Sequence, residues 1–138
     1  MTQEEKDLLL DDLCARLSHG VKIQVNDKIE TLDSIDILDK VVGYDSFLAS
    51  YLEEVKPYLF PLSSMTDEQK KELKQYTCPN GTGYFDGYSL CCPVNHFGEN
   101  IPFEFMSRII DWLNKNHFDY RGLIEKGLAI DCTNLNIY

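Results

Sequence analysis

The sequence has no long hydrophobic run and few basic residues, and each absence excludes a class of protein. A membrane-spanning helix needs about 18 or more consecutive apolar residues, and the chain contains no such run, so we expect no membrane span. Lys and Arg number 13 against 23 Asp and Glu, which gives a formal net charge of -10. Direct binding to nucleic acid is therefore not expected, because it needs Lys and Arg clustered against phosphates.

The first residues lack the pattern of a secretion signal. Such a signal has a basic start followed by an apolar stretch, whereas here the start is acidic and Leu8–Leu10 is followed at once by two aspartates. We therefore predict a cytoplasmic protein. In that reducing compartment the five cysteines are expected to be free, mostly buried thiols.

The composition of the chain predicts one folded domain that spans residues 1–138. Hydrophobic residues make up 43% of the chain and aromatic residues 12%, which is too much for a disordered protein. The charge is uneven, because residues 1–69 hold 15 acids and 6 bases while residues 70–138 hold 8 and 7. The acidic half could face a basic partner, or it could simply be a well-solvated surface.

The first half of the chain predicts a helix followed by a small antiparallel sheet. Thr2 and Glu5 have the spacing of a capping box, and leucines recur at helical spacing up to Leu17. Apolar and polar residues then alternate over 21–25 and 29–37, on either side of a turn at 26–28. With a short segment at 41–42 these segments predict about three strands. Residues 47–58 fit a helix that Pro57 would end, and residues 58–64 are predicted to cross or edge the sheet.

The second half predicts helices. A second capping box at Thr66 and Gln69 begins a largely exposed helix that runs to about Tyr76. If segment 103–115 is a helix, its apolar residues cover most of the helix circumference, which predicts the central and most buried helix. Asp119 is predicted to cap a short helix that stops at Gly127, with a terminal strand at 128–130. The predicted fold is thus α+β, with helices from both chain ends packed on one face of the sheet.

Four possible metal ligands fall within nineteen residues: Cys78, Cys91, Cys92 and His96. Thiolates and imidazoles bind zinc, but the close pair of cysteines is adjacent, and neighbouring side chains point apart in an extended chain. Packing thiols and a loop histidine are the alternative. A thiol nucleophile is another possibility, with Cys91 or Cys92 meeting His96, His117 or His19, but no local elbow supports it. We predict no cofactor.

The same region carries four aromatic residues in a glycine-rich stretch: Tyr84, Phe85, Tyr88 and Phe97. Aromatic side chains on such a loop can form a patch that binds a partner protein, or they can pack inward. The glycines of residues 81–87 do not form a dinucleotide-binding loop, because the third glycine comes one residue late and no helix follows.

Two longer stretches are similar to known sequences: residues 55–66, and residues 112–114 with 117–129. Residues 13–17 and 20–22 belong to the same similarity. The sequences of these stretches resemble those of a group of small, uncharacterised proteins of phages and mobile elements of gut bacteria. The resemblance implies an accessory protein of a mobile genome that binds a host or phage protein, and it implies no activity or site residues.

The sequence as a whole therefore predicts a non-enzymatic protein that acts by binding another protein. One form of this hypothesis is a DNA mimic, in which the acidic half displays phosphate-like charge to a basic target. The competing hypothesis is a small metal-binding protein or thiol enzyme that uses the cysteines and histidine of residues 78–96.

Overall fold

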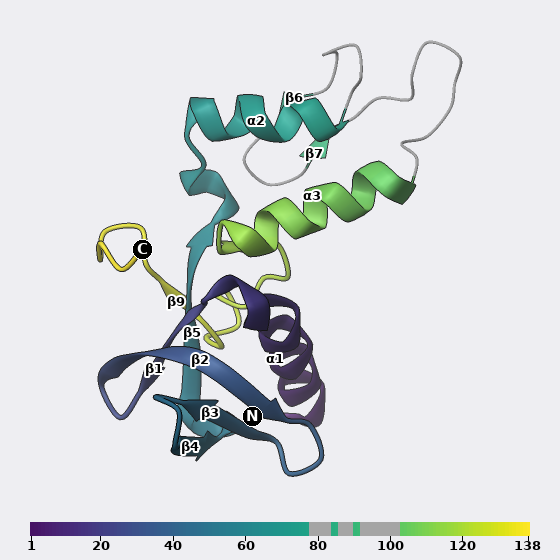
Figure 1. The fold of residues 1–138 in the computed structure, drawn as a ribbon. Helices are drawn as coiled ribbons and strands as arrows, with labels where there is room; N and C mark the ends of the chain where they lie inside the picture. The colour runs from purple at the N-terminus through teal and green to yellow at the C-terminus, as the bar shows by residue number, and fades with distance from the viewer. Residues whose placement is uncertain (78–83, 86–89, 92–102) are drawn as a thin grey trace.

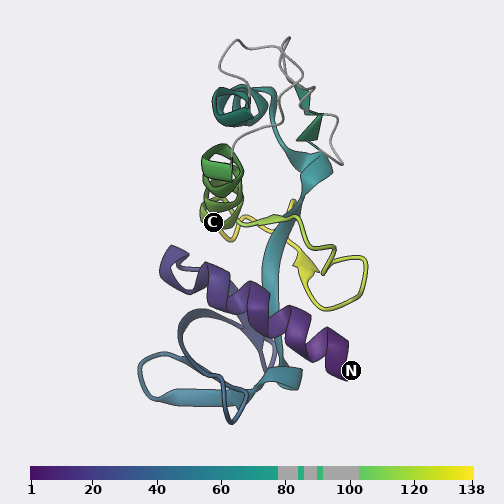
Figure 2. The ribbon, with the colours of Figure 1, turned by 90° about the vertical axis from the view of Figure 1, so that its right-hand side faces the viewer.

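One long strand, β5 (Val55–Pro61), connects the two halves of the fold (Figures 1 and 2). The computed structural model describes residues 1–77, 84–85, 90–91 and 103–138, and the side chains of residues 1–76 and 106–138. At one end of β5 lie the other long strands and the first helix. At its other end two further helices pack against each other.

The sheet has seven strands, so the prediction of an α+β fold is confirmed and the predicted number of about three strands is too low. The strand order is β4-β3-β2-β1-β5-β8, and β9 also pairs with β5. The pairs from β4 through β5 are antiparallel, whereas β8 and β9 run parallel to β5. The remaining strands are β1 (Lys22–Val25), β2 (Lys28–Asp36), β3 (Val41–Tyr44), β4 (Leu48–Tyr51), β8 (Phe118–Asp119) and β9 (Ile130–Asp131).

The predicted hairpin between the first two strands is confirmed. Asn26 and Asp27 both have positive φ, at 49° and 63°. Two consecutive residues of this conformation make the tight turn whose twist matches that of antiparallel strands, and Asn and Asp tolerate it better than other side chains.

Residues 47–58 form strands rather than the helix that their spacing fits. β4 pairs with β3 along its whole length, and a short 3-10 turn, Leu52–Glu54, leads directly into β5. Leu52 and Val55 are fully buried while Leu48 and Tyr51 are exposed, so the four residues do not share one buried face. β5 lies inside the sheet between β1 and β8, so of the two predicted alternatives for residues 58–64 the position at an edge does not hold.

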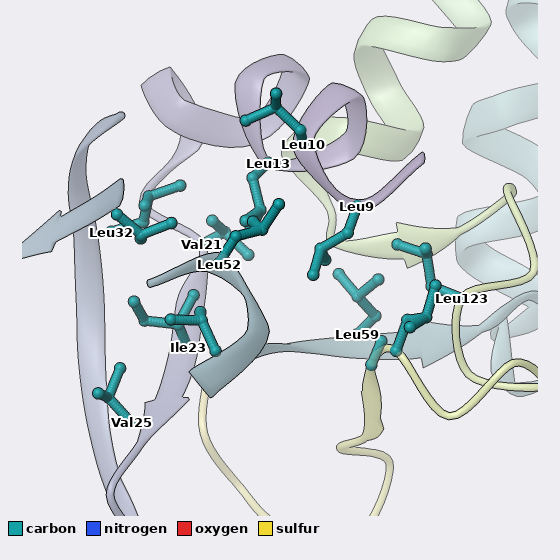
Figure 3. Packing of buried hydrophobic residues seen from close by; sticks show 14 of the residues in the cluster. Leu9, Leu10, Leu13, Val21, Ile23, Val25, Leu32, Leu52, Leu59 and Leu123 are labelled. Carbon is teal, nitrogen blue, oxygen red and sulfur yellow. The ribbon is translucent and has the colours of Figure 1, made fainter. Parts of the chain in front are cut away.

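Helix α1 (Gln3–Arg16) begins at the predicted capping box. The Thr2 hydroxyl accepts a hydrogen bond from the Glu5 backbone N–H at 3.1 Å, and the Glu5 carboxylate accepts one from the Thr2 N–H at 2.7 Å. One face of α1 places Leu9, Leu10 and Leu13 against the sheet (Figure 3). These leucines meet side chains of β1, β2 and β5 to form the larger core, in which each fully buried leucine contributes about 1.5–3 kcal/mol.

A second core lies at the other end of the molecule, between α2 (Asp67–Thr77) and α3 (Phe103–Lys115). Ile109, Trp112 and Leu113 of α3 are buried there, but Met106 is 42% exposed. α3 is thus buried on one face only, and the prediction that it is the central helix is wrong. Only α1 of the terminal helices packs in the larger core, since the buried side chains of α3 lie with Leu73 of the largely exposed α2.

The segment after β8 keeps the predicted cap without the predicted helix. The Asp119 carboxylate accepts hydrogen bonds from the N–H groups of Arg121, Leu123 and Ile124 at 2.8–3.3 Å. Gly122 has a φ of 74°, a left-handed conformation that interrupts a right-handed helix, so the chain forms turns. A terminal strand is present as β9, but it covers Ile130–Asp131 and shares only Ile130 with the predicted range of 128–130.

Candidate protein-binding site

Half of the exposed large hydrophobic side chains described belong to the hairpins of β2, β3 and β4, with Leu38 in the turn before β3 and Phe47 in the turn after it. Ten large hydrophobic side chains are exposed in the part of the chain whose side chains are described, and five of them fall between residues 37 and 51. Leu38 is 93% exposed, Phe47 96% and Tyr51 64%. Scattered exposed apolar residues are normal on a soluble protein, but a concentration of them marks an interaction site. We call residues 33–54 the hairpin surface.

Two turns on the hairpin surface hold these side chains outward through aspartate side chains. The Asp36 carboxylate accepts hydrogen bonds at 3.0 Å from the N–H groups of Leu38 and Asp39 in the turn between β2 and β3. The Asp33 carboxylate accepts one at 2.7 Å from the N–H of Ser46, beside Phe47 in the next turn. Because the turns are fixed in this way, the two apolar side chains are displayed by ordered backbone.

The outward face of the three strands is shallow in its middle. The pairing places Ser34, Gly43 and Ala49 in one row across β2, β3 and β4, and these are small side chains. A Cβ atom on Gly43 would lie 2.0 Å from the Ser34 Oγ, so a larger residue here would force the Ser34 hydroxyl to move. The three residues help to line a depression of about 380 Å³, whose full lining is Ser34, Ile35, Asp36, Ile37, Val41, Gly43 and Ala49.

Strand β4 is an edge of the sheet. The Leu52 N–H donates to the Lys40 carbonyl oxygen at 3.0 Å, so these two residues form a hydrogen-bonded pair. Hydrogen-bonded and non-hydrogen-bonded pairs alternate along an antiparallel ladder, so the backbone N–H and C=O groups of Ala49 and Tyr51 point away from β3. The Tyr51 N–H donates to the Glu54 carboxylate at 3.1 Å, and the Ala49 groups face the open side of the edge.

The hairpin surface carries much of the negative charge of the protein. Residues 33–54 contain six Asp or Glu and one Lys, which gives a net charge of -5 out of -10. Lys40 is already paired with Asp7 of α1 at 3.3 Å. Glu53 also contacts α1, through an ion pair with Lys6. A partner of this surface would therefore meet apolar side chains surrounded by carboxylates.

A buried group of charges lies towards the C-terminal end of α1. Asp12 and Arg16 of α1 are both fully buried, and the Arg16 guanidinium donates to the Asp12 carboxylate at 2.8 and 3.0 Å. Arg16 also donates to the Phe118 carbonyl oxygen at 2.7 Å, and Arg121 lies 3.5 Å from Asp12. The group joins α1 to β8 and to the turns after β8, which is a structural role.

The cysteines with described side chains are poorly suited to nucleophilic chemistry. Burial raises the pKa of the Cys132 thiol to about 11, with a further contribution from Asp131. Cys14 is exposed, contrary to the expectation of buried thiols, and partial desolvation together with the charge of Asp11 raises its pKa as well. Because the thiolate is the reactive form, a raised pKa makes both thiols weaker nucleophiles at neutral pH. His117, one base considered for a thiol enzyme, is buried and stacks on Tyr138 with ring centroids 3.8 Å apart.

The site residues predicted from the sequence lie almost entirely outside the described residues. This holds for the possible ligands Cys78, Cys92 and His96 and for the aromatic residues Tyr88 and Phe97. The backbones of the others form a two-stranded antiparallel sheet, which is the second of the two possibilities, a loop or a short hairpin, that the composition of residues 77–100 indicates. It consists of β6 (Tyr84–Phe85) and β7 (Leu90–Cys91), and it pairs Tyr84 with Cys91 and Phe85 with Leu90.

Two further surveys cover only the described part of the chain. Within it, no three side chains of His, Cys, Asp or Glu are grouped so that they could hold a metal ion. No helix within it has both the length and the apolar character needed to cross a membrane.

A second depression, a groove of about 320 Å³, lies beside α2 and α3. It is lined by charged residues of both signs and by the aromatic side chains of Tyr76 and Trp112. Its full lining is His19, Glu72, Tyr76, Arg108, Asp111, Trp112, Lys115 and Asn116.

Comparisons with protein-family models, with curated proteins and with solved structures found no match for this chain. The candidate site therefore rests on the geometry of the hairpin surface.

We expect the protein to lose stability as the pH falls from about 6.5 to about 4, in part through His117. Burial, aided by the nearby charge of Arg16, lowers the pKa of His117 to about 4. The unfolded chain takes up a proton at its ordinary pKa of about 6.5, so in this window the unfolded state binds more protons and is favoured. The expected loss is about 1–2 kcal/mol, after allowance for partial solvent screening.

Urea unfolding at several pH values measures this effect, with His117→Asn as the matched variant. Asn tolerates the left-handed backbone of residue 117, whose φ is 62°, and it does not titrate. The variant should show a shallower dependence of stability on pH between 6.5 and 4. An unchanged slope would show that His117 is not the group responsible.

Proposed function

We propose that this protein is a non-enzymatic binding protein whose hairpin surface contacts a basic region of another protein. The observation that carries the proposal is the exposure of Leu38, Phe47 and Tyr51, which lie on the two turns and the edge strand of one three-stranded unit instead of packing in a core. Large exposed side chains at a partner interface commonly provide most of the binding energy. The proposal agrees with the accessory role that the resemblance to phage and mobile-element proteins implies.

The charge of the surface indicates the kind of partner. A net charge of -5 over residues 33–54 favours a positively charged partner and repels an acidic one. The carboxylates alternate with exposed apolar side chains instead of forming a continuous row like the phosphates of DNA. The surface therefore favours a partner with both apolar and basic residues over a DNA-binding protein that recognises a DNA mimic. Binding should weaken as salt rises, because rim charges are screened.

The test begins with capture of partners from the source cells on the immobilised full-length protein, followed by purification of each captured protein. The variant Leu38→Ser/Phe47→Ser/Tyr51→Ser removes the exposed apolar groups of the hairpin surface. A matched control, Ile29→Ser/Met106→Ser/Leu135→Ser, removes three side chains that are 42–54% exposed elsewhere. The dissociation constant of the purified pair is then measured by calorimetry at two salt concentrations.

We expect the first variant to weaken binding of a purified basic partner at least 100-fold, since interface aromatic residues commonly contribute 2 kcal/mol or more each. The control should bind within a factor of about three of the original protein. Equal affinity of the two variants for every purified partner would contradict the proposal.

A further inference from the structure

We infer that the partner binds by adding an extended, basic segment as a new strand beside β4. This inference rests on the proposed function and specifies how the hairpin surface would be used. β4 is the last strand in the sheet order, and its outward backbone groups belong to Ala49 and Tyr51. An exposed strand edge offers these groups to any extended peptide that can approach it, and main-chain hydrogen bonds then provide affinity.

Glu54 gives this edge a preference for positive charge. Its carboxylate accepts the hydrogen bond of the Tyr51 N–H at 3.1 Å, and so occupies one of the outward positions. A Lys or Arg on an incoming strand can pair with that carboxylate and draw it away from the backbone. The Tyr51 N–H then becomes available to donate to a carbonyl oxygen of the incoming strand. A neutral or acidic segment gains no such exchange.

The side chains beside the edge indicate the pattern of the incoming segment. Ala49 and Tyr51 lie on the outward face, in the same rows as Gly43 and Val41. An apolar side chain next to the small Ala49 would extend over the depression without a clash. Alternate residues of a strand point to opposite faces, so a segment in which apolar and basic residues alternate fits this edge.

A second copy of this chain is a poor occupant of the same edge. Pairing β4 with β4 of another molecule would bring two surfaces of net charge -5 together. The exposed edge is also only four residues long, from Leu48 to Tyr51, which limits self-association. The charge therefore favours a basic strand of a different protein.

The probe is a synthetic ten-residue peptide of alternating lysine and valine, titrated into the 15N-labelled full-length protein. We expect amide shift changes concentrated at β4 and a dissociation constant below 1 mM. The decisive variant is Ala49→Pro, which removes an N–H that points away from β3 and leaves the ladder between β3 and β4 intact. It should weaken peptide binding roughly 10-fold.

A peptide N-methylated at alternate residues makes the same test from the other side, on the unchanged protein, and should also bind roughly 10-fold more weakly. It decides the matter if Ala49→Pro disturbs the fold. Equal binding of the methylated and unmethylated peptides would overturn strand addition, and so would shift changes away from β4, self-association without peptide binding, or no shift changes at 1 mM. The proposed function would fail separately, through unchanged partner binding by the Leu38, Phe47 and Tyr51 variant.

Discussion

Replacing Arg16 with alanine is expected to destabilise the protein by about 3–5 kcal/mol. Arg16 and Asp12 are both fully buried, and the guanidinium makes two hydrogen bonds to the carboxylate and one to the Phe118 carbonyl oxygen. Without Arg16, the Asp12 charge is buried with only the more distant Arg121 to compensate it, at 3.5 Å. Burial already raises the pKa of the Asp12 carboxyl against the effect of both arginines.

Urea unfolding measures this loss, with Lys28→Ala as a control because Lys28 is an exposed residue of β2. The control should change the free energy of unfolding by less than about 0.5 kcal/mol. The double variant Asp12→Leu/Arg16→Met should be more stable than Arg16→Ala, because it leaves no unpaired buried carboxylate. A loss below 1 kcal/mol in Arg16→Ala would show that the ion pair does not hold α1 to β8.

Replacing Ile109 with aspartate is expected to cost at least about 3 kcal/mol, because it places an unpaired carboxylate in the second core. Ile109 is 3% exposed and packs with Trp112 and Leu73 between α2 and α3. From the sequence alone this substitution is expected to unfold the whole protein. The presence of two cores changes the expectation, since the packing of α2 and α3 should be lost first.

Trp112 is the single tryptophan of the chain and reports directly on this core. Its ring stacks on that of Phe118 with centroids 5.7 Å apart, so loss of the core should shift its fluorescence to longer wavelength. Met106→Asp is the matched control, because Met106 belongs to the same helix and is 42% exposed. A soluble Ile109→Asp protein with native tryptophan emission would contradict the buried position of Ile109.

Local patterns were sufficient to predict the elements that local interactions determine. The capping box at Thr2, the turn at Asn26 and Asp27, and the Asp119 cap all involve residues within five positions of each other, and the structure has all three. The apolar pattern of segment 103–115 correctly predicts a helix, but it does not predict which element that helix packs against. A wide apolar face shows that a helix packs against something, and it does not show whether the neighbour is the sheet or α2.

The remaining strands depend on contacts between distant parts of the chain. β8 and β9 have two residues each and exist because they pair with β5, which is some 60 to 70 positions away in the sequence. Leu48, Tyr51, Leu52 and Val55 have helical spacing, yet β4 pairs with β3 and β5 with β1. Tertiary pairing of this kind overrides local periodicity, because each short strand gains its hydrogen bonds from a partner.

The hairpin surface is not among the sites that the sequence predicts, because the grouped cysteines and aromatic residues of 78–97 are a stronger local pattern. One signal was available, since Leu38 and Phe47 stand beside the turn residues Asp39 and Ser46. Such positions lie on the surface, so a large apolar side chain there has no core to enter. The open edge of β4 could not be found in the same way, because it follows from the order of strands in the sheet.

The central claim is that the hairpin surface is where the partner binds. Amide hydrogen exchange of the full-length protein, free and in complex with a purified partner, tests it most directly. The account predicts new protection in residues 36–51, strongest at Ala49 and Tyr51, with α2 and α3 unchanged. Protection confined to α2, α3 and the groove around Trp112, with residues 36–51 exchanging as in the free protein, would contradict it.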